Sequence, residues 1–111
     1  MRILFVENHA RFAKLTTQQF LSQHQVTIVG SLHSARAALD QEFDLMLIDY
    51  DLDDGKGDEL VSELQRRCQR PKIIAVSSHQ AGNEKLFQAG ADTICEKIKF
   101  TKIAETIDRL F

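Results

Sequence analysis

The sequence predicts an α/β fold in which a doubly wound, five-stranded parallel sheet carries helices on both faces. Three observations lead to this prediction. Short apolar runs recur along the 111 residues, the runs show no polar alternation, and segments of helical composition separate them. Continuous apolar runs are typical of strands covered on both faces, as in parallel sheets. Their alternation with helices indicates one parallel sheet between two layers of helices.

Five strands and five helices are expected in strict alternation. The expected strands are residues 2–6, 26–30, 44–48, 72–76 and 92–96, the last being the weakest. The expected helices are residues 10–23, 35–41, 57–68, 83–88 and 101–111. Ser34 can cap the second helix, Pro71 closes the third, and Gly90 follows the fourth. Right-handed crossovers leave few topologies, and the common one for five strands is the flavodoxin-like order 2-1-3-4-5.

Composition narrows the class of protein to a single globular domain, residues 1–111. The formal net charge is -2, from 14 basic and 16 acidic residues, so no electrostatic argument favours nucleic acid or an anionic membrane as a partner. No apolar run approaches the ~20 residues that span a bilayer, and no signal peptide is visible, so we expect a cytoplasmic protein. Cys68 and Cys95 lie far apart and are expected to be reduced thiols.

Polar residues with complementary chemistry follow the predicted strands. In an open parallel sheet, ligands bind at the carboxyl ends of the strands where the strand order reverses, here between the first and third strands. The residues at these ends are Glu7, Asn8, Asp49, Ser77 and Lys97. Ser78 is an alternative to Ser77 if the fourth strand ends one residue later.

This set of side chains predicts an aspartate that accepts a phosphoryl group. Glu7, Asn8 and Asp49 offer oxygen ligands, which a hard cation such as Mg²⁺ prefers. The cation and Lys97 would offset charge on the transferring oxygens, and Ser77 would donate a hydrogen bond to one of them.

Four segments resemble the receiver domain of two-component response regulators, along essentially the whole chain. ILFVEN resembles the family's first strand with its acidic pair, and LMLIDYDLDDGKG resembles the phosphoacceptor segment with Gly57 eight residues after Asp49. VSS at 76–78 places Ser77 at the family's Ser/Thr position, and QAGADTICEK leads to its lysine, here Lys97.

The resemblance implies a role for each site residue and a set of partners. Asp49 would accept the phosphoryl group, with Ser77 and Lys97 assisting. Mg²⁺ would be held by Asp49, the carbonyl of Asp51, and Glu7 or Asn8. A sensor histidine kinase or phosphotransfer protein would be the donor, and a downstream protein or a second copy in a homodimer would read the signal. The protein would not be an enzyme beyond self-phosphorylation and autodephosphorylation.

Two other functions remain open at this stage. Asn8, Asp53, Ile94 and Ile98 depart from the family pattern, which motivates a phosphorylation-independent pseudo-receiver that acts only as an interaction module. Asp49 and Asp51 also form the Asp-x-Asp pair of haloacid-dehalogenase-like phosphatases, although that family places the pair on its first strand in a longer chain. A calcium loop is excluded because its sixth and twelfth positions hold Asp54 and Leu60 instead of glycine and glutamate.

Overall fold

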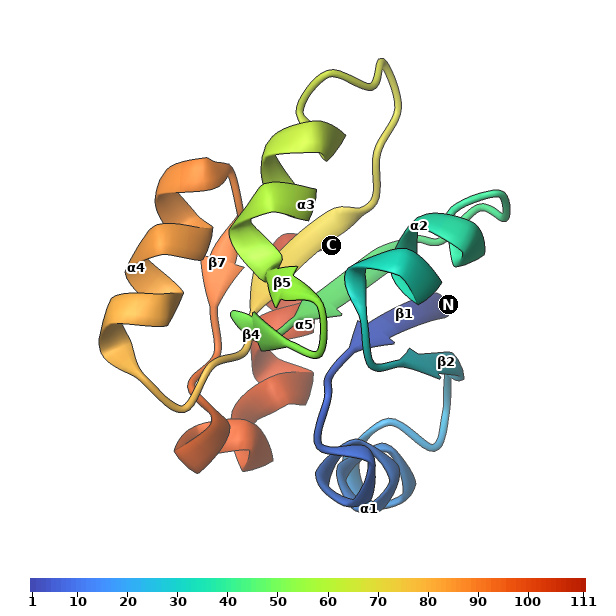
Figure 1. Cartoon of the computed structure of the whole chain (residues 1–111). Coiled ribbons are helices and arrows are strands. Elements are labelled where there is room, and N and C mark those ends of the chain that lie inside the picture. The colour runs from blue at the N-terminus through green and yellow to red at the C-terminus, as the bar shows by residue number, and fades with distance from the viewer.

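The computed structural model describes all 111 residues, and its centre is a five-stranded parallel sheet (Figure 1). The strand order is β2-β1-β3-β6-β7, which is the predicted order 2-1-3-4-5 because β4 and β5 form a separate hairpin. The fold class and the strand order are therefore confirmed. The strands of the sheet are β1 (Arg2–Val6), β2 (Gln25–Val29), β3 (Leu45–Ile48), β6 (Lys72–Ala75) and β7 (Thr93–Ile94).

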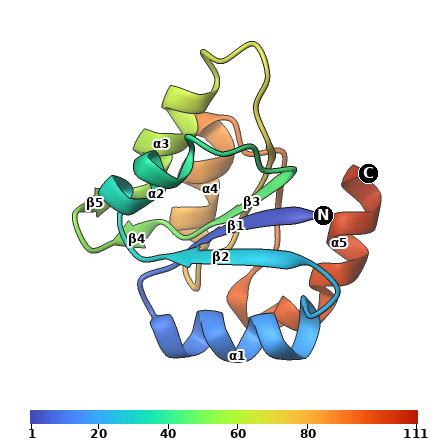
Figure 2. The same ribbon diagram turned by 90° about the vertical axis from the view of Figure 1, so that its right-hand side faces the viewer.

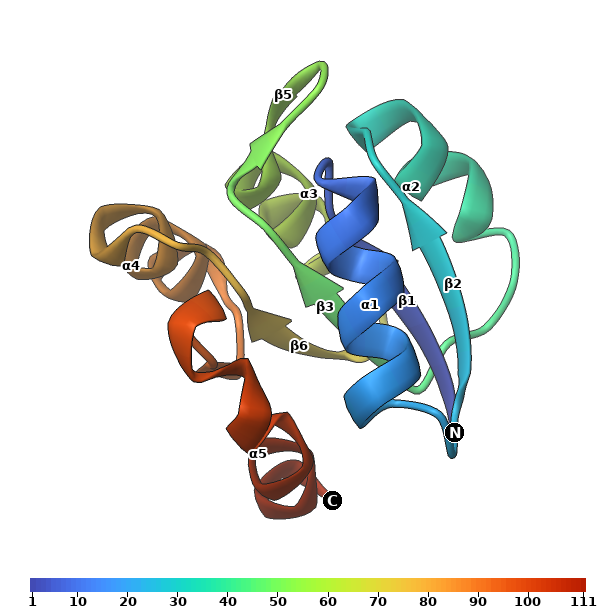
Figure 3. The same cartoon turned by 90° about the horizontal axis from the view of Figure 1, so that it is seen from below.

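Helices cover both faces of the sheet. One face carries α1 and α5, and the opposite face carries α2, α3 and α4 (Figure 2). The view from below shows α1 and α5 on the same side of the strands (Figure 3). The helices are α1 (Ala10–Phe20), α2 (Leu32–Ala38), α3 (Gly57–Leu64), α4 (Gln80–Ala89) and α5 (Ile103–Leu110), and a 3₁₀ helix, η1 (Lys97–Lys102), leads into α5.

The central strands are apolar without alternation because each of their faces meets a hydrophobic core. On one side, alternate residues of β1 and β3 such as Leu4 and Met46 pack with α2, α3 and α4. On the other side, Ile3 and Leu45 pack with α1, η1 and α5. All four of these side chains are fully buried. The two cores fix the sheet between its helices and leave the polar residues at the strand ends outside them.

Helix boundaries differ from the predicted ones where local capping decides them. The second helix begins at Leu32 rather than Ala35, because the backbone of Ser31 is extended and its hydroxyl accepts a hydrogen bond from the Ser34 N–H. The fourth helix begins at Gln80, three residues before the predicted start, so the loop after β6 is short. Gly82 lies in its first turn, and a glycine there lowers helix propensity.

The segment after β3 forms a hairpin that the apolar pattern did not indicate. Its strands are β4 (Asp51–Leu52) and β5 (Gly55–Lys56), paired antiparallel. Gly55 has a φ of 158°, a conformation that L residues with a side chain rarely adopt. The Asp54 carboxylate accepts hydrogen bonds from the N–H groups of Leu32 (2.7 Å) and His33 (3.0 Å). The hairpin is thereby attached to the N-terminus of α2.

None of the helices has the length and the apolar composition that crossing a membrane requires.

Candidate functional site

Asp49 lies at the carboxyl end of the central strand β3, where parallel pairing continues one residue past the strand. Its N–H donates to the carbonyl of Val6 at 2.9 Å, which brings the ends of β1 and β3 together. Its Oδ1 accepts a hydrogen bond from the Tyr50 N–H at 2.8 Å. Asp49 is only 4% exposed. Asp49 is therefore a buried carboxylate at the carboxyl end of the central strand of the sheet.

Gly57 allows the chain to return close to Asp49. Its N–H donates to the Tyr50 carbonyl at 2.7 Å, which closes the hairpin and starts α3. A Cβ atom at this position would overlap the carbonyl oxygen of Asp49. Glycine is therefore required here by the close approach of two backbone segments.

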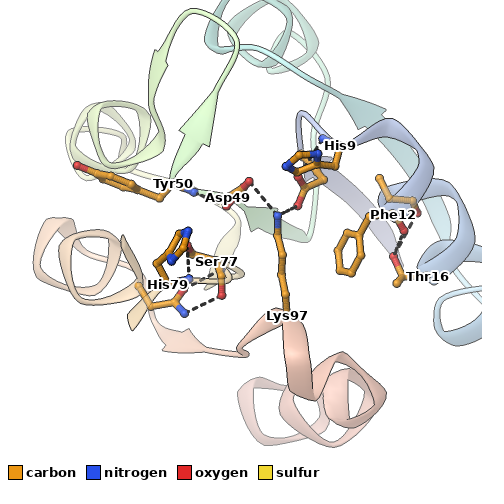
Figure 4. A network of polar contacts seen from close by, with 11 residues as sticks. His9, Phe12, Thr16, Asp49, Tyr50, Ser77, His79 and Lys97 are labelled. Atoms are coloured by element: carbon orange, nitrogen blue, oxygen red, sulfur yellow. Dashed lines mark hydrogen bonds and ion pairs between the residues drawn. The ribbon is translucent and has the colours of Figure 1, made fainter. Parts of the chain in front are cut away.

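Lys97 is the cation of the site. Its Nζ lies 3.1 Å from Asp49 Oδ2 and 2.8 Å from Glu7 Oε1, so one ammonium bridges two carboxylates from neighbouring strands (Figure 4). The Lys97 side chain is 13% exposed, and its Nζ lies 5.2 Å from the centroid of the Phe12 ring. Cation–π contact and two ion pairs together hold the ammonium at the strand ends.

Glu7 is the most deeply buried charged residue of the site, at 1% exposure. Burial raises the pKa of its carboxyl, and the negative charge of Asp49 acts in the same direction. The hydrogen bond with Lys97 and the His9 N–H, which donates to Oε2 at 3.0 Å, oppose the rise without cancelling it. Two carboxylates thus share one lysine, and a second cation at this position would relieve their repulsion.

Asn8 follows Glu7 and carries an oxygen with no partner. Its Oδ1 is buried and makes no hydrogen bond. A buried polar oxygen without a partner is unfavourable unless a ligand satisfies it. No three side chains of His, Cys, Asp and Glu gather into a metal-binding cluster, so a cation here would need amide and carbonyl oxygens as well as carboxylates. The side chains of Glu7, Asn8 and Asp49 offer oxygen atoms, the ligands that a hard divalent cation prefers.

Ser77 and Ser78, the two candidate serines after β6, differ in burial. Ser77 follows β6 and is 2% exposed, whereas Ser78 is exposed. The Ser77 hydroxyl oxygen accepts a hydrogen bond from the His79 N–H at 3.2 Å, so its own proton remains free to donate (Figure 4). The hydroxyl, the Lys97 ammonium and the Asp49 carboxylate come from the ends of three different β-α segments.

Asp51 does not join Asp49 through its side chain. Its carboxylate pairs with the ammonium of Lys56 across the hairpin, and this hydrogen bond lowers the pKa of the Asp51 carboxyl. Tyr50 pairs with Gly57 by a hydrogen bond, so the alternation of an antiparallel ladder leaves the Asp51 carbonyl pointing away from the opposite strand. The carbonyl is available as a ligand, but the nucleophile and acid of an Asp-x-Asp phosphatase are not brought together.

Two residues of the site were not predicted. Phe12 contacts the Lys97 ammonium from α1, and the sequence presents it only as one apolar residue among several in that helix. Asn83 of α4 is 2% exposed and binds the backbone of Ser77. Its polar side chain lay in a segment predicted as helix, where only its burial distinguishes it from a surface asparagine.

Comparison with known protein families finds one that matches nearly the whole chain. The response regulator receiver domain family matches residues 3–108. The chain belongs to this family. No curated protein matches the sequence. Receiver domains are signalling modules of two-component systems, and the resemblance carried by the strand-end motifs is therefore confirmed at the level of the family.

Solved receiver domains share the whole fold. A response regulator receiver domain protein from Methanospirillum hungatei JF-1 is 25% identical, with a TM-score of 0.85 over 97% of this chain and 90% of that one. The receiver domain of a sensor histidine kinase from Pseudomonas aeruginosa PAO1 is also 25% identical, with a TM-score of 0.84 over 97% of this chain and 94% of the other. That receiver domain has a magnesium ion coordinated in its active site cleft.

Proposed function

We propose that this chain is a single receiver domain, residues 1–111, that accepts a phosphoryl group on Asp49 in a two-component phosphorelay. The observation that carries the proposal is the position of the Lys97 ammonium, 3.1 Å from Asp49 and 2.8 Å from Glu7. One cation held between two buried carboxylates is the arrangement that a receiver needs to hold a transferred group of high negative charge. The full set of proposed site residues is Glu7, Asn8, Asp49, Asp51, Ser77 and Lys97.

The oxygen donors of the site would hold Mg²⁺. Asp49 would supply a carboxylate oxygen, Asp51 its carbonyl, Asn8 its unpartnered Oδ1, and Glu7 a second negative charge nearby. When bound, the cation offsets charge on the phosphoryl oxygens during transfer. Asn8 contributes an oxygen without charge, so we expect Mg²⁺ to bind more weakly here than at a site with an aspartate in its place.

In the transfer, an oxygen of the Asp49 carboxylate attacks the phosphorus while the bond from phosphorus to the donor breaks. The donor would be the phosphohistidine of a sensor histidine kinase or phosphotransfer protein. The Lys97 ammonium would neutralise one phosphoryl oxygen, and the Ser77 hydroxyl would donate a hydrogen bond to another. Because Lys97 already contacts Asp49, the site is organised before the donor arrives.

The new group would change the surface that the chain presents to other proteins. A phosphoryl group adds about two negative charges and new acceptor oxygens. Movement of Ser77 and Lys97 toward these oxygens would alter the segments that follow them, α4 and η1. We propose that a downstream protein in the cytoplasm, or a second copy of this chain, binds the altered surface. The chain would act by binding, with no enzymatic activity beyond its own phosphorylation and dephosphorylation.

The test is the intact mass of the chain after incubation with Mg²⁺ and a small acyl phosphate donor such as acetyl phosphate. We expect one added phosphoryl group, which does not form when a chelator removes Mg²⁺ before the donor is added and is absent in Asp49→Asn. Asp53→Asn is the matched control, because Asp53 is an exposed aspartate four residues away and should leave the added group in place.

Three results would count against the proposal. An added group that survives in Asp49→Asn would place the acceptor elsewhere. No added group even at high Mg²⁺ would favour a pseudo-receiver that acts only by binding. Steady turnover of phosphate esters without a stable adduct would favour a phosphatase.

A further inference from the structure

Asn83 is a buried polar residue of α4 that phosphoryl transfer as described above does not use. It lies near the start of the helix and is 2% exposed. Its side chain makes two buried hydrogen bonds, both to the backbone of Ser77. The Ser77 N–H donates to Asn83 Oδ1 at 2.9 Å, and Asn83 Nδ2 donates to the Ser77 carbonyl at 3.1 Å. The side-chain amide of Asn83 thus binds both the N–H and the carbonyl of Ser77.

The N–H of Ser77 has no backbone partner in the sheet. The sheet ends just before it: Cys95 donates to the carbonyl of Ala75, and Val76 donates to the carbonyl of Ile48. At the Ser77 N–H, the amide oxygen of Asn83 takes the place that the carbonyl of a neighbouring strand would have. The serine is therefore positioned from α4, although it follows a strand of the sheet.

The same carbonyl also connects Asn83 with Lys97. The Lys97 N–H donates to the Ser77 carbonyl at 3.3 Å, so this oxygen accepts hydrogen bonds from both α4 and the start of η1. The hydroxyl and the ammonium that would contact the phosphoryl oxygens come from the two residues joined at this oxygen. Loss of the Asn83 amide would loosen both.

The start of α4 also lies in direct contact with the site. A Cβ atom on Gly82 would lie 2.8 Å from the Ser77 hydroxyl oxygen and 2.9 Å from Tyr50 Cβ. This close approach brings α4 near enough for Asn83 to reach the Ser77 backbone. A displacement of Ser77 would therefore be transmitted to the first turn of α4 through the two hydrogen bonds.

We propose that Asn83 is a positioning residue for phosphoryl transfer, which orients Ser77 and Lys97 toward Asp49. This inference rests on the proposed function, because it assigns Asn83 to the same reaction. A purely structural role is the alternative, since α4 has no side-chain hydrogen bond from its N-cap residue His79. That alternative predicts a less stable chain whose folded fraction takes up phosphoryl groups at the ordinary rate.

The decisive variant is Asn83→Asp in the full chain, which keeps the shape of the side chain. The ionised carboxylate can accept from the Ser77 N–H, but it cannot donate to the Ser77 carbonyl and repels it. When protonated, the carboxyl can do both, as the amide does. Glu84 and Glu96 line a cavity of about 350 Å³ beside Asn83, and His79 precedes the helix. Burial and the two carboxylates would raise the pKa of the introduced carboxyl, against the hydrogen bond from the Ser77 N–H, which lowers it.

The measurement is the rate constant of phosphorylation by acetyl phosphate and Mg²⁺, expressed relative to the unmodified chain at each pH. Circular dichroism at each pH reports the folded fraction. Gln80→Glu is the matched control, because it adds the same charge to the same turn at an exposed position. Asn83→Ser is the second variant, in case Asn83→Asp does not fold at neutral pH, and its short hydroxyl cannot bridge both peptide groups.

We expect Asn83→Asp to be phosphorylated about tenfold more slowly at about pH 7.5, a factor that corresponds to ~1.4 kcal/mol. The deficit should shrink toward about pH 5.5 as the introduced carboxyl takes up a proton. Asn83→Ser should be slow at both pH values, and Gln80→Glu should match the unmodified chain.

Unchanged rates in folded Asn83→Asp and Asn83→Ser would overturn the inference, as would a deficit in Asn83→Asp that does not depend on pH. Failure of the proposed function has a different signature, because the unmodified chain and Gln80→Glu would then also take up no phosphoryl group. That result would remove both proposals together.

Discussion

Removal of the Lys97 ammonium should destabilise the folded chain because two buried carboxylates would lose their shared cation. Lys97→Met keeps the length of the side chain and its contact with Phe12, so it changes mainly the charge. Breaking a buried ion pair by removing one partner costs about 3–5 kcal/mol. The Lys97 side chain is 13% exposed, and this partial access to water favours the lower end, about 3 kcal/mol.

Urea denaturation followed by circular dichroism measures this loss. With a denaturant slope of about 2 kcal/mol/M, the midpoint should fall by about 1.5 M. Lys99→Met is the matched control: Lys99 is exposed, lies two residues away and makes no ion pair, so its loss should cost less than about 0.5 kcal/mol. Adding Glu7→Gln to Lys97→Met should recover part of the stability, because only one carboxylate then remains without a partner.

Equal midpoints for Lys97→Met and Lys99→Met would refute this reasoning. That result would mean that water or dissolved ions stabilise the carboxylates of Glu7 and Asp49 as well as the lysine does. The position of the Lys97 ammonium would then contribute nothing to the free energy of unfolding.

Two further predictions concern the fold around the site. Burial, the largest single effect on the Asp92 carboxyl, raises its pKa. The hydrogen bonds from the Arg70 guanidinium and the Ile73 N–H and the positive charge of Arg70 together outweigh burial, so the pKa of Asp92 lies below its ordinary value of 3.8. The ionised Asp92 carboxylate stabilises the fold above pH 3.8, and this contribution is lost as the pH falls through its lower folded-state pKa. In acid titrations, the unfolding free energy of Asp92→Asn should therefore decrease less over this pH range than that of the unmodified chain. Gly57→Ala should lower the unfolding free energy by at least about 2 kcal/mol, because its Cβ would overlap the Asp49 carbonyl, and an unchanged urea midpoint would contradict this.

The strands and their order could be predicted because a strand that is buried on both faces appears in the sequence as a run of apolar residues. Runs such as residues 45–48 contain no polar residue, and all four side chains are buried in β3. The strand ends then determine which polar residues meet at one edge of the sheet. Asp49 and Lys97, 48 positions apart in the sequence, could be expected near each other for this reason, and the distance between them is 3.1 Å.

The remaining features depend on contacts that no local pattern reports. The hairpin of residues 51–56 has strands of two residues, too short for any alternation, although Asp54-Gly55 is a common turn sequence. The start of α4 lies before the predicted one because Gly82 weakens the helical pattern in the sequence. The same glycine is needed there because a side chain would block the approach of α4 to Ser77. The role of Asn83 follows only from the hydrogen bond between its amide and the backbone of Ser77, which no sequence pattern indicates.

Aromatic residues of the hydrophobic core determine where the positive charge of the site lies. Phe100 follows Lys97 by three residues in η1, and its ring stacks on that of Phe5 at 5.8 Å with an interplanar angle of 1°. The same ring meets Phe12 edge to face at 5.6 Å. The anchor point of the ammonium is therefore set by ring packing on one side of the sheet. A substitution that changes the volume of the apolar side chain at Phe100 would therefore move the Lys97 ammonium at the strand ends, although it alters no polar atom.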